Sequence, residues 1–259
     1  MARTRRSNVP WSISSWFLKL KLSLMLKLST ALSSLMGLIY VADDPSGFFL
    51  ASEAIRATGN FLLIHSLASK KTCSGLSLKS QELTALYLAA RVYCGFVMES
   101  GIHTVVDIVS FLSTASIIYM MRFKLKSSYC RAEDQLPLYY LVVPCLILAS
   151  LIHPNEVGLI SDIVWAFSLY LESLSILPQL LVTKKLKSQR TKPFTSNYVH
   201  ALAVARFLSC TYWFFEGLMT FGDFLSFFGS GLAWISMALI ADCVQTCILV
   251  IFCYYYYVM

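Results

Sequence analysis

Three arginines lie inside apolar stretches long enough to cross a membrane: Arg56, Arg91 and Arg206. A charged side chain near the middle of a bilayer costs roughly 3 kcal/mol on insertion scales, so it usually faces a cavity, a partner or a ligand. The sequence therefore predicts a membrane protein with a charged interior, and that interior is where its function should reside. Acidic residues at comparable depth supply candidate partners: Asp107, Asp162, Glu172 and Asp242.

Composition points to a polytopic, all-α membrane protein. Of 259 residues, 57% are hydrophobic and only 14% are charged, whereas soluble domains are nearer a quarter charged. The net charge of +7 does not indicate nucleic-acid binding, because the cations are not gathered on one soluble face and no nucleic-acid module is recognisable. The eight cysteines lack metal-ligand spacing, and no catalytic constellation is visible. We therefore expect no metal, no cofactor and no enzymatic activity.

Apolar runs of about 20 residues mark the membrane spans. We take the first span as a retained anchor, because it lacks a small-x-small cleavage site; the alternative is a cleaved signal peptide after the basic start. The stretch 219–232 contains glycines and Asp223 and is expected to form an interfacial loop. The predicted spans are 22–42, 47–69, 80–99, 101–121, 137–153, 157–183, 197–218 and 233–257.

The loops between these spans differ sharply in charge. Lysines and arginines gather in the N-terminal segment and in the loops near 70–79, 122–136 and 184–196. The opposite loops at 43–46, 154–156 and 219–232 contain no lysine or arginine. Because cationic loops remain in the cytosol, both termini are predicted to be cytosolic, with the excess charge close to anionic lipid.

Two short polar turns suggest an internal repeat. One turn lies between the second and third spans, and the other contains Pro178 and Gln179 near the end of the sixth. Two three-helix units joined by a linking helix form a transporter-like architecture with a cavity at the repeat interface.

Several collinear strings resemble the KDEL/HDEL receptors, the family of ER lumen protein retaining receptors. They include Cys73-Ser-Gly-Leu-Ser-Leu-Lys-Ser-Gln81, Tyr140-Leu-Val-Val-Pro144 and, best of all, Trp165-Ala-Phe-Ser-Leu-Tyr-Leu-Glu172-Ser-Leu-Ser-Ile-Leu-Pro-Gln-Leu180. Ala201-Leu-Ala-Val-Ala-Arg206 and Val244-Gln-Thr246 continue the match in order. The resemblance covers roughly residues 47–257, and the extra N-terminal span resembles the plant ER-retention-receptor-like branch.

The resemblance implies a seven-helix bundle similar to SWEET and PQ-loop transporters. Residues 1–46 would then be a basic cytosolic N-terminus with an extra transmembrane helix, and 47–259 the receptor-like domain. Family members are multi-pass proteins of ER and Golgi membranes. They bind the C-terminal Lys/His-Asp-Glu-Leu of escaped ER residents in a luminal cavity, more tightly at acidic pH. COPI carriers then return them, so COPI and COPII coat machinery are implied partners.

The resemblance also implies a set of signal-binding residues. Arg91 matches the family arginine that contacts the peptide's carboxylate end, and a desolvated guanidinium suits a carboxylate. Arg206 matches a second family arginine, and Trp213 lies seven residues on, two turns along the same face. The alternatives are an ion pair between Arg91 and an acid such as Glu172, and plain packing for Trp213.

Two acidic positions and one tryptophan extend this set. Asp162 takes the place of a family glutamate that recognises the basic first residue of the signal, and Trp165 matches the neighbouring family tryptophan. Glu172 matches a buried glutamate in the polar network that responds to protonation. The alternative for Glu172 is permanent neutralisation of Arg91 or Arg206.

Several positions depart from the family pattern. Phe49 stands where the family has an arginine, Arg56 where it has its pH-sensing histidine, and Ala205 where it has a tyrosine. Because arginine stays charged across physiological pH, Arg56 predicts weaker pH dependence, and it might replace the cation lost at Phe49. His103 and His153 lie near luminal ends and could titrate in an acidic compartment, or serve as interfacial polar residues. The remaining departures are Cys94, Glu216, Ile251 and an end at Met259 without the family's lysine-bearing tail.

Three functional hypotheses remain. The leading one is a receptor for C-terminal ER-retention signals that works in Golgi-to-ER retrieval. The second is a SWEET-like or PQ-loop-like transporter of a small solute, for which a mostly neutral path would be expected. The third is a divergent trafficking partner that no longer binds the signal.

Overall fold

The computed structural model describes residues 46–98, 101–155, 157–188, 196–219 and 233–257. The predicted span at 22–42 and nearly all of the loop 219–232 lie outside these residues. The regular structure of the described residues is entirely helical, and the helices from Phe48 onward belong to one compact unit. The α-helices are α2 (Ser46–Lys70), α3 (Leu78–Val97), α4 (Ile102–Tyr119), α5 (Tyr139–Leu151), α6 (Leu159–Leu174), α7 (Leu177–Ser188), α8 (Ser196–Met219) and α9 (Ala233–Tyr257).

The described helices coincide with the predicted spans from 47–69 onward, because each long apolar run buries its backbone polar groups in helical hydrogen bonds. The predicted span at 157–183 coincides with one segment long and apolar enough to cross a membrane, Leu159–Lys185, and this segment consists of two helices, α6 and α7. The helix is interrupted between Leu174 and Leu177, one residue before Pro178, which cannot donate a backbone hydrogen bond. Within the described residues, three segments are long and apolar enough to cross a membrane: Ile102–Lys124, Leu159–Lys185 and Ser236–Tyr256.

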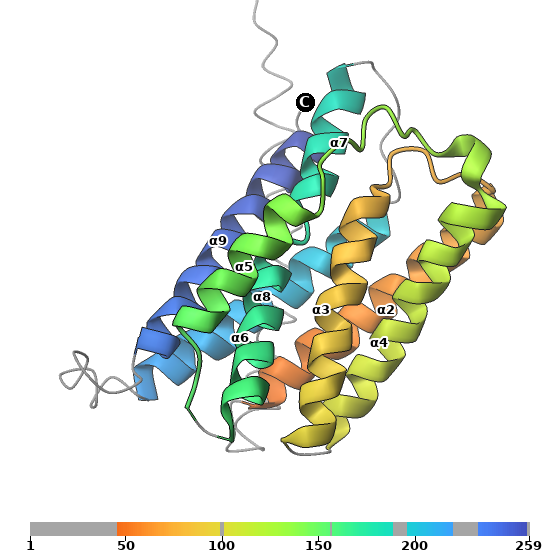
Figure 1. Ribbon diagram of the computed structural model, residues 1–259. Helices are drawn as coiled ribbons and strands as arrows, with labels where there is room; N and C mark the ends of the chain where they lie inside the picture. Colours follow the sequence, from red (N-terminus) through yellow and green to blue (C-terminus); the bar gives the residue numbers. More distant parts are fainter. Residues whose placement is uncertain (1–45, 99–100, 156, 189–195, 220–232, 258–259) are drawn as a thin grey trace, which may run out of the picture. The chain divides into compact units, whose positions relative to one another are not determined.

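Helices α3 and α6 lie at the centre of the described bundle (Figure 1). Helix α3 packs against α4 and α6, while α5 and α9 pack against α6, and α8 packs against α9. Small residues allow one close approach: a Cβ added to Gly59 of α2 would lie 3.0 Å from the Cβ of Ala201 in α8. The centre of the bundle therefore consists of the two helices that bear Arg91 and Glu172.

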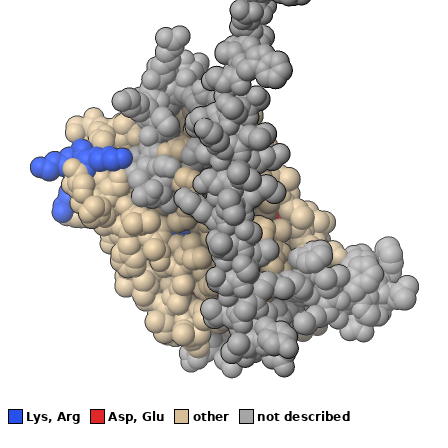
Figure 2. All heavy atoms as spheres, turned by 180° about the vertical axis from the view of Figure 1, so that it is seen from behind, with Lys and Arg blue, Asp and Glu red and all other residues tan. Residues whose placement is uncertain are grey.

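The outer face of the helices is apolar. Leu112, Leu151 and Val250 expose 58%, 75% and 62% of their surface, which suits contact with lipid chains rather than water. In Figure 2 most described atoms belong to uncharged residues, and the visible lysines and arginines gather mainly at one end. The described unit is apolar on its outer face and charged inside, which is the arrangement expected of a membrane protein.

At one end of the bundle the two polar turns meet. The backbone N–H of Ser77 donates to Gln179 Oε1 at 2.8 Å, and Gln179 Nε2 donates to the carbonyl oxygen of Gly75, also at 2.8 Å. Gly75 has a positive φ of 88°, which glycine adopts without steric strain. Gln179 therefore fixes the loop before α3 to the start of α7, and so joins the two halves of the suggested repeat.

Asp134 holds the same loop from the other side. Its carboxylate accepts hydrogen bonds from the Ser77 hydroxyl at 2.9 Å, the Lys79 backbone N–H at 3.0 Å and the Tyr129 hydroxyl at 2.8 Å. Burial and the Asp134 carboxylate raise the pKa of Tyr129 well above its usual range, so the phenol stays protonated and donates.

Replacing Asp134 by alanine will destabilise this end of the protein. Three donors lose a charged, buried acceptor, so we expect a loss of about 2–3 kcal/mol. The measurement is the apparent melting temperature of the detergent-solubilised protein at a fixed scan rate. Ser127→Ala, at an exposed position close by in the chain, serves as the control. Equal melting temperatures for the two variants would contradict the prediction.

Candidate functional site

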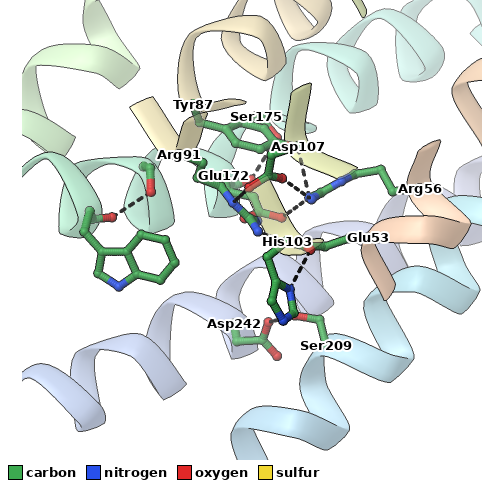
Figure 3. A network of polar contacts seen from close by, with 12 residues as sticks. Glu53, Arg56, Tyr87, Arg91, His103, Asp107, Glu172, Ser175, Ser209 and Asp242 are labelled. Atoms are coloured by element: carbon green, nitrogen blue, oxygen red, sulfur yellow. Dashed lines mark hydrogen bonds and ion pairs between the residues drawn. The ribbon is translucent and has the colours of Figure 1, made fainter. Parts of the chain in front are cut away.

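Glu172 of α6 is the point at which the three buried arginines meet. Figure 3 shows two of them, Arg56 and Arg91, beside Glu172. Its Oε1 lies 2.6 Å from Arg56 Nη1 and also contacts Arg206 Nη2. Its Oε2 lies 3.4 Å from Arg91 Nη1. Because the guanidiniums come from α2, α3 and α8, four helices of both halves converge on one carboxylate. The sequence suggested that Glu172 neutralises Arg91 or Arg206. In the structure Glu172 pairs with both arginines and also with Arg56.

Further carboxylates surround these arginines. Arg91 Nε donates to Asp107 Oδ2 at 3.0 Å, and Arg206 Nη1 donates to Asp242 Oδ1, also at 3.0 Å. Arg91 also forms an ion pair with Glu53, whose side chain is fully buried. Asp107 and Asp242 are thus arginine partners, as their depth in the sequence suggested. Sequence reasoning missed Glu53, although it lies one helical turn before Arg56 in the same apolar run.

Arg56 and Phe49 have different partners in the cluster. Besides Glu172, its Nη1 donates to the Tyr87 hydroxyl at 3.2 Å, and its Nη2 lies 3.8 Å from Asp107 Oδ1. The Phe49 ring instead covers Arg91, whose guanidinium carbon lies 5.0 Å from the ring centroid. This is a cation–π contact. The aromatic ring therefore screens one face of Arg91.

The residues that were expected to recognise the signal differ in their burial and contacts. Asp162, at the start of α6, is fully buried and accepts backbone hydrogen bonds from Val157 at 3.4 Å and Gly158 at 3.2 Å. It thereby caps the positive end of the helix. Trp165, one turn further along, is partly buried and faces a pocket. Trp213 belongs to α8, but its side chain lies outside the described residues.

Two pockets adjoin the arginine cluster. The first contains Arg91, Arg206, Glu172 and Trp165 in its lining, together with Phe49 and Asp242. The second is lined by Arg56, hydroxyl groups such as those of Tyr87 and Tyr198, and Ala205. The lining of both pockets includes Glu172, Arg206 and Gln245, so the central ion pair separates them. Among the described residues, no group of three or more metal-ligating side chains is present.

This arrangement defines a class of protein. It is a polytopic helical membrane protein with a charged pocket, in which guanidiniums are presented beside an aromatic wall. Such a pocket suits a ligand that carries both a carboxylate and positive or apolar parts.

Comparison with known proteins places the chain in a family. A family model described as "ER lumen protein retaining receptor" matches residues 72–216. The "ER lumen protein-retaining receptor B" of Arabidopsis thaliana is 32% identical over 215 residues, which cover 81% of this chain and 93% of the relative. The receptor of Petunia hybrida is 31% identical over the same shares, and that of Drosophila melanogaster is 30% identical over 65% of this chain and 78% of its own. The chain belongs to the ER lumen protein retaining receptor family.

Proposed function

We propose that this protein binds C-terminal ER-retention signals of the Lys/His-Asp-Glu-Leu type and serves in their retrieval. The observation that carries the proposal is the first pocket, in which Arg91, Arg206 and Trp165 line one cavity in a member of this receptor family. Its charged lining suits a peptide carboxylate better than a neutral sugar, and so favours a receptor over a small-solute transporter.

The peptide carboxylate would bind by exchange. Arg91 and Arg206 each contact carboxylates of the protein already, so an incoming carboxylate competes with Glu53, Glu172 or Asp242 for them. Exchange between paired partners avoids leaving a buried guanidinium uncompensated, which would cost several kcal/mol. Asp162 and Trp165 would receive the basic first residue of the signal, and Trp213 would extend the aromatic wall.

The proposal includes an orientation and a location. The pocket opens to the lumen of the ER and Golgi, and the loop held by Gln179 and Asp134 faces the cytosol, where coat proteins of the COPI and COPII type bind. Residues 1–46 supply an extra transmembrane helix, and 47–259 form the receptor domain. The charge asymmetry of the loops supports this orientation.

Binding of labelled signal peptides to the purified protein tests the function. A peptide with a free C-terminus should bind at least about tenfold more tightly than its amidated form, because amidation removes the charged partner of the guanidiniums. Arg206→Ala should abolish this difference, whereas Arg122→Ala, at an exposed arginine outside the pocket, should leave it intact. The proposal would be overturned if the protein bound both peptides equally well, or if it bound neither of them.

A further inference from the structure

His103 occupies a particular place beside the arginine cluster. It lies in the first turn of α4, and its Nδ1 is 3.1 Å from Glu53 Oε2 (Figure 3). The His103 side chain is 39% exposed, whereas that of Glu53 is fully buried. An imidazole that reaches the solvent thus touches a carboxylate that does not. The other oxygen of that carboxylate contacts Arg91.

Among the residues that the structure describes, the charges of the cluster do not balance without this histidine. Its cations are Arg56, Arg91 and Arg206, and their ion-pair partners are four carboxylates: Glu53, Asp107, Glu172 and Asp242. With a neutral imidazole, one buried negative charge is in excess. A ligand carboxylate adds another, and like charges at low dielectric repel each other strongly. A proton on His103 restores the balance before the ligand enters.

Charged groups from each neighbouring helix set the field at His103. Glu53 comes from α2, and Arg91 reaches the same carboxylate from α3. Asp107 lies one turn further along α4 and is occupied by Arg91 at 3.0 Å and by Arg56 at 3.8 Å. The Phe49 ring, 5.6 Å from the imidazole, separates it from Tyr212 of α8. Within the described residues, Glu53 contacts the imidazole directly, and it links His103 to Arg91.

We propose that His103 is a positioning residue that, once protonated, holds Glu53 and so releases Arg91 for the carboxylate of the bound peptide. The inference rests on the proposed function, since it assigns the regulation of the same pocket. An ordinary imidazole takes up a proton from solvent as the pH falls through about 6.5. Binding is therefore tight in acid and is lost as the pH rises through that range.

This assignment changes the expectation drawn from Arg56. A fixed guanidinium at that position cannot report pH, and the sequence therefore predicted weak pH dependence. His103 acts from a different helix, through Glu53, so pH control survives the replacement of the family histidine. Arg56 is always positively charged, whereas the side chain that gains and loses a proton is the partly exposed His103.

Peptide binding at about pH 5.5 and about pH 7.5, on either side of the histidine range, tests the inference. We expect the unaltered protein to bind the free-acid peptide about tenfold more tightly at the lower pH, and His103→Gln to lose most of that difference. His103→Lys should bind tightly at both pH values, because its charge is fixed. His153→Gln is the matched control, since that imidazole faces the carbonyl oxygen of Pro154 at 2.7 Å. A His103→Gln profile equal to the unaltered one would overturn the inference.

Failure of the proposed function is distinguishable from failure of this inference. If the unaltered protein binds no peptide at either pH, the receptor function fails, and thermal unfolding still tests the histidine. The contact between His103 and Glu53 becomes a charge-assisted ion pair only when the ring is protonated, whereas a neutral ring donates at most an uncharged hydrogen bond from Nδ1. The unaltered protein should therefore exceed His103→Gln in melting temperature more at pH 5.5 than at pH 7.5. The same difference at both pH values would count against His103 even without a ligand.

Discussion

A Glu172→Leu variant will lose about 3–5 kcal/mol of its free energy of unfolding, because the three guanidiniums around it lose their shared carboxylate. Arg56 is affected most, since its remaining carboxylate neighbour, Asp107, lies 3.8 Å away and already pairs with Arg91. The apparent melting temperature in detergent should fall by about 10 °C.

The control for this change is Glu82→Leu. Glu82 also pairs with two cations, Lys79 and Arg122, but their side chains are 33% and 54% exposed. Exposed pairs contribute at most about 1 kcal/mol, so this variant should melt close to the unaltered protein. If the Glu172 variant proves as stable as the control, the cluster is not held by its central carboxylate.

Phe49→Arg should strengthen binding of the free-acid signal peptide by about 10- to 100-fold at neutral pH. The new guanidinium would stand where an aromatic ring now covers Arg91, beside a cluster with one more carboxylate than arginine. Charge-assisted hydrogen bonds contribute about 1.5–3 kcal/mol each, which gives the expected range. The measurement is a peptide titration at pH 7.5.

Phe49→Leu separates charge from the loss of the ring. This control removes the cation–π contact without adding a cation, so its affinity should stay within about threefold of the unaltered protein. The amidated peptide should show no gain with Phe49→Arg. A gain of equal size for both peptides would mean that the arginine acts on the pocket's shape instead of its charge.

Much of the fold was predictable, because a bilayer fixes the length of a span and forces its backbone into a helix. The spans from 47–69 onward follow from the apolar runs. The break between Leu174 and Leu177 was not predicted, because the run stays apolar through Pro178. A hydropathy ruler measures transfer to lipid and does not detect where helical hydrogen bonding is interrupted.

Most residues of the site could be predicted from the sequence, but the ion pairs that they form could be predicted less well. Buried arginines are conspicuous in apolar sequence, and Glu172 and Asp107 followed as partners. The choice of partner depends on how helices distant in sequence face one another, and no spacing within one helix fixes that. Glu53 was overlooked for this reason, and with it the contact that links His103 to Arg91.

The interruption between α6 and α7 is a joint between two helices that make different contacts. Helix α6 brings Glu172 to the arginines, and α7, about two turns further along the chain, brings Gln179 to the loop before α3. A ligand that draws an arginine away from Glu172 pulls on the last turn of α6, next to the joint. Occupancy of the pocket is therefore expected to change how firmly the loop before α3 is held.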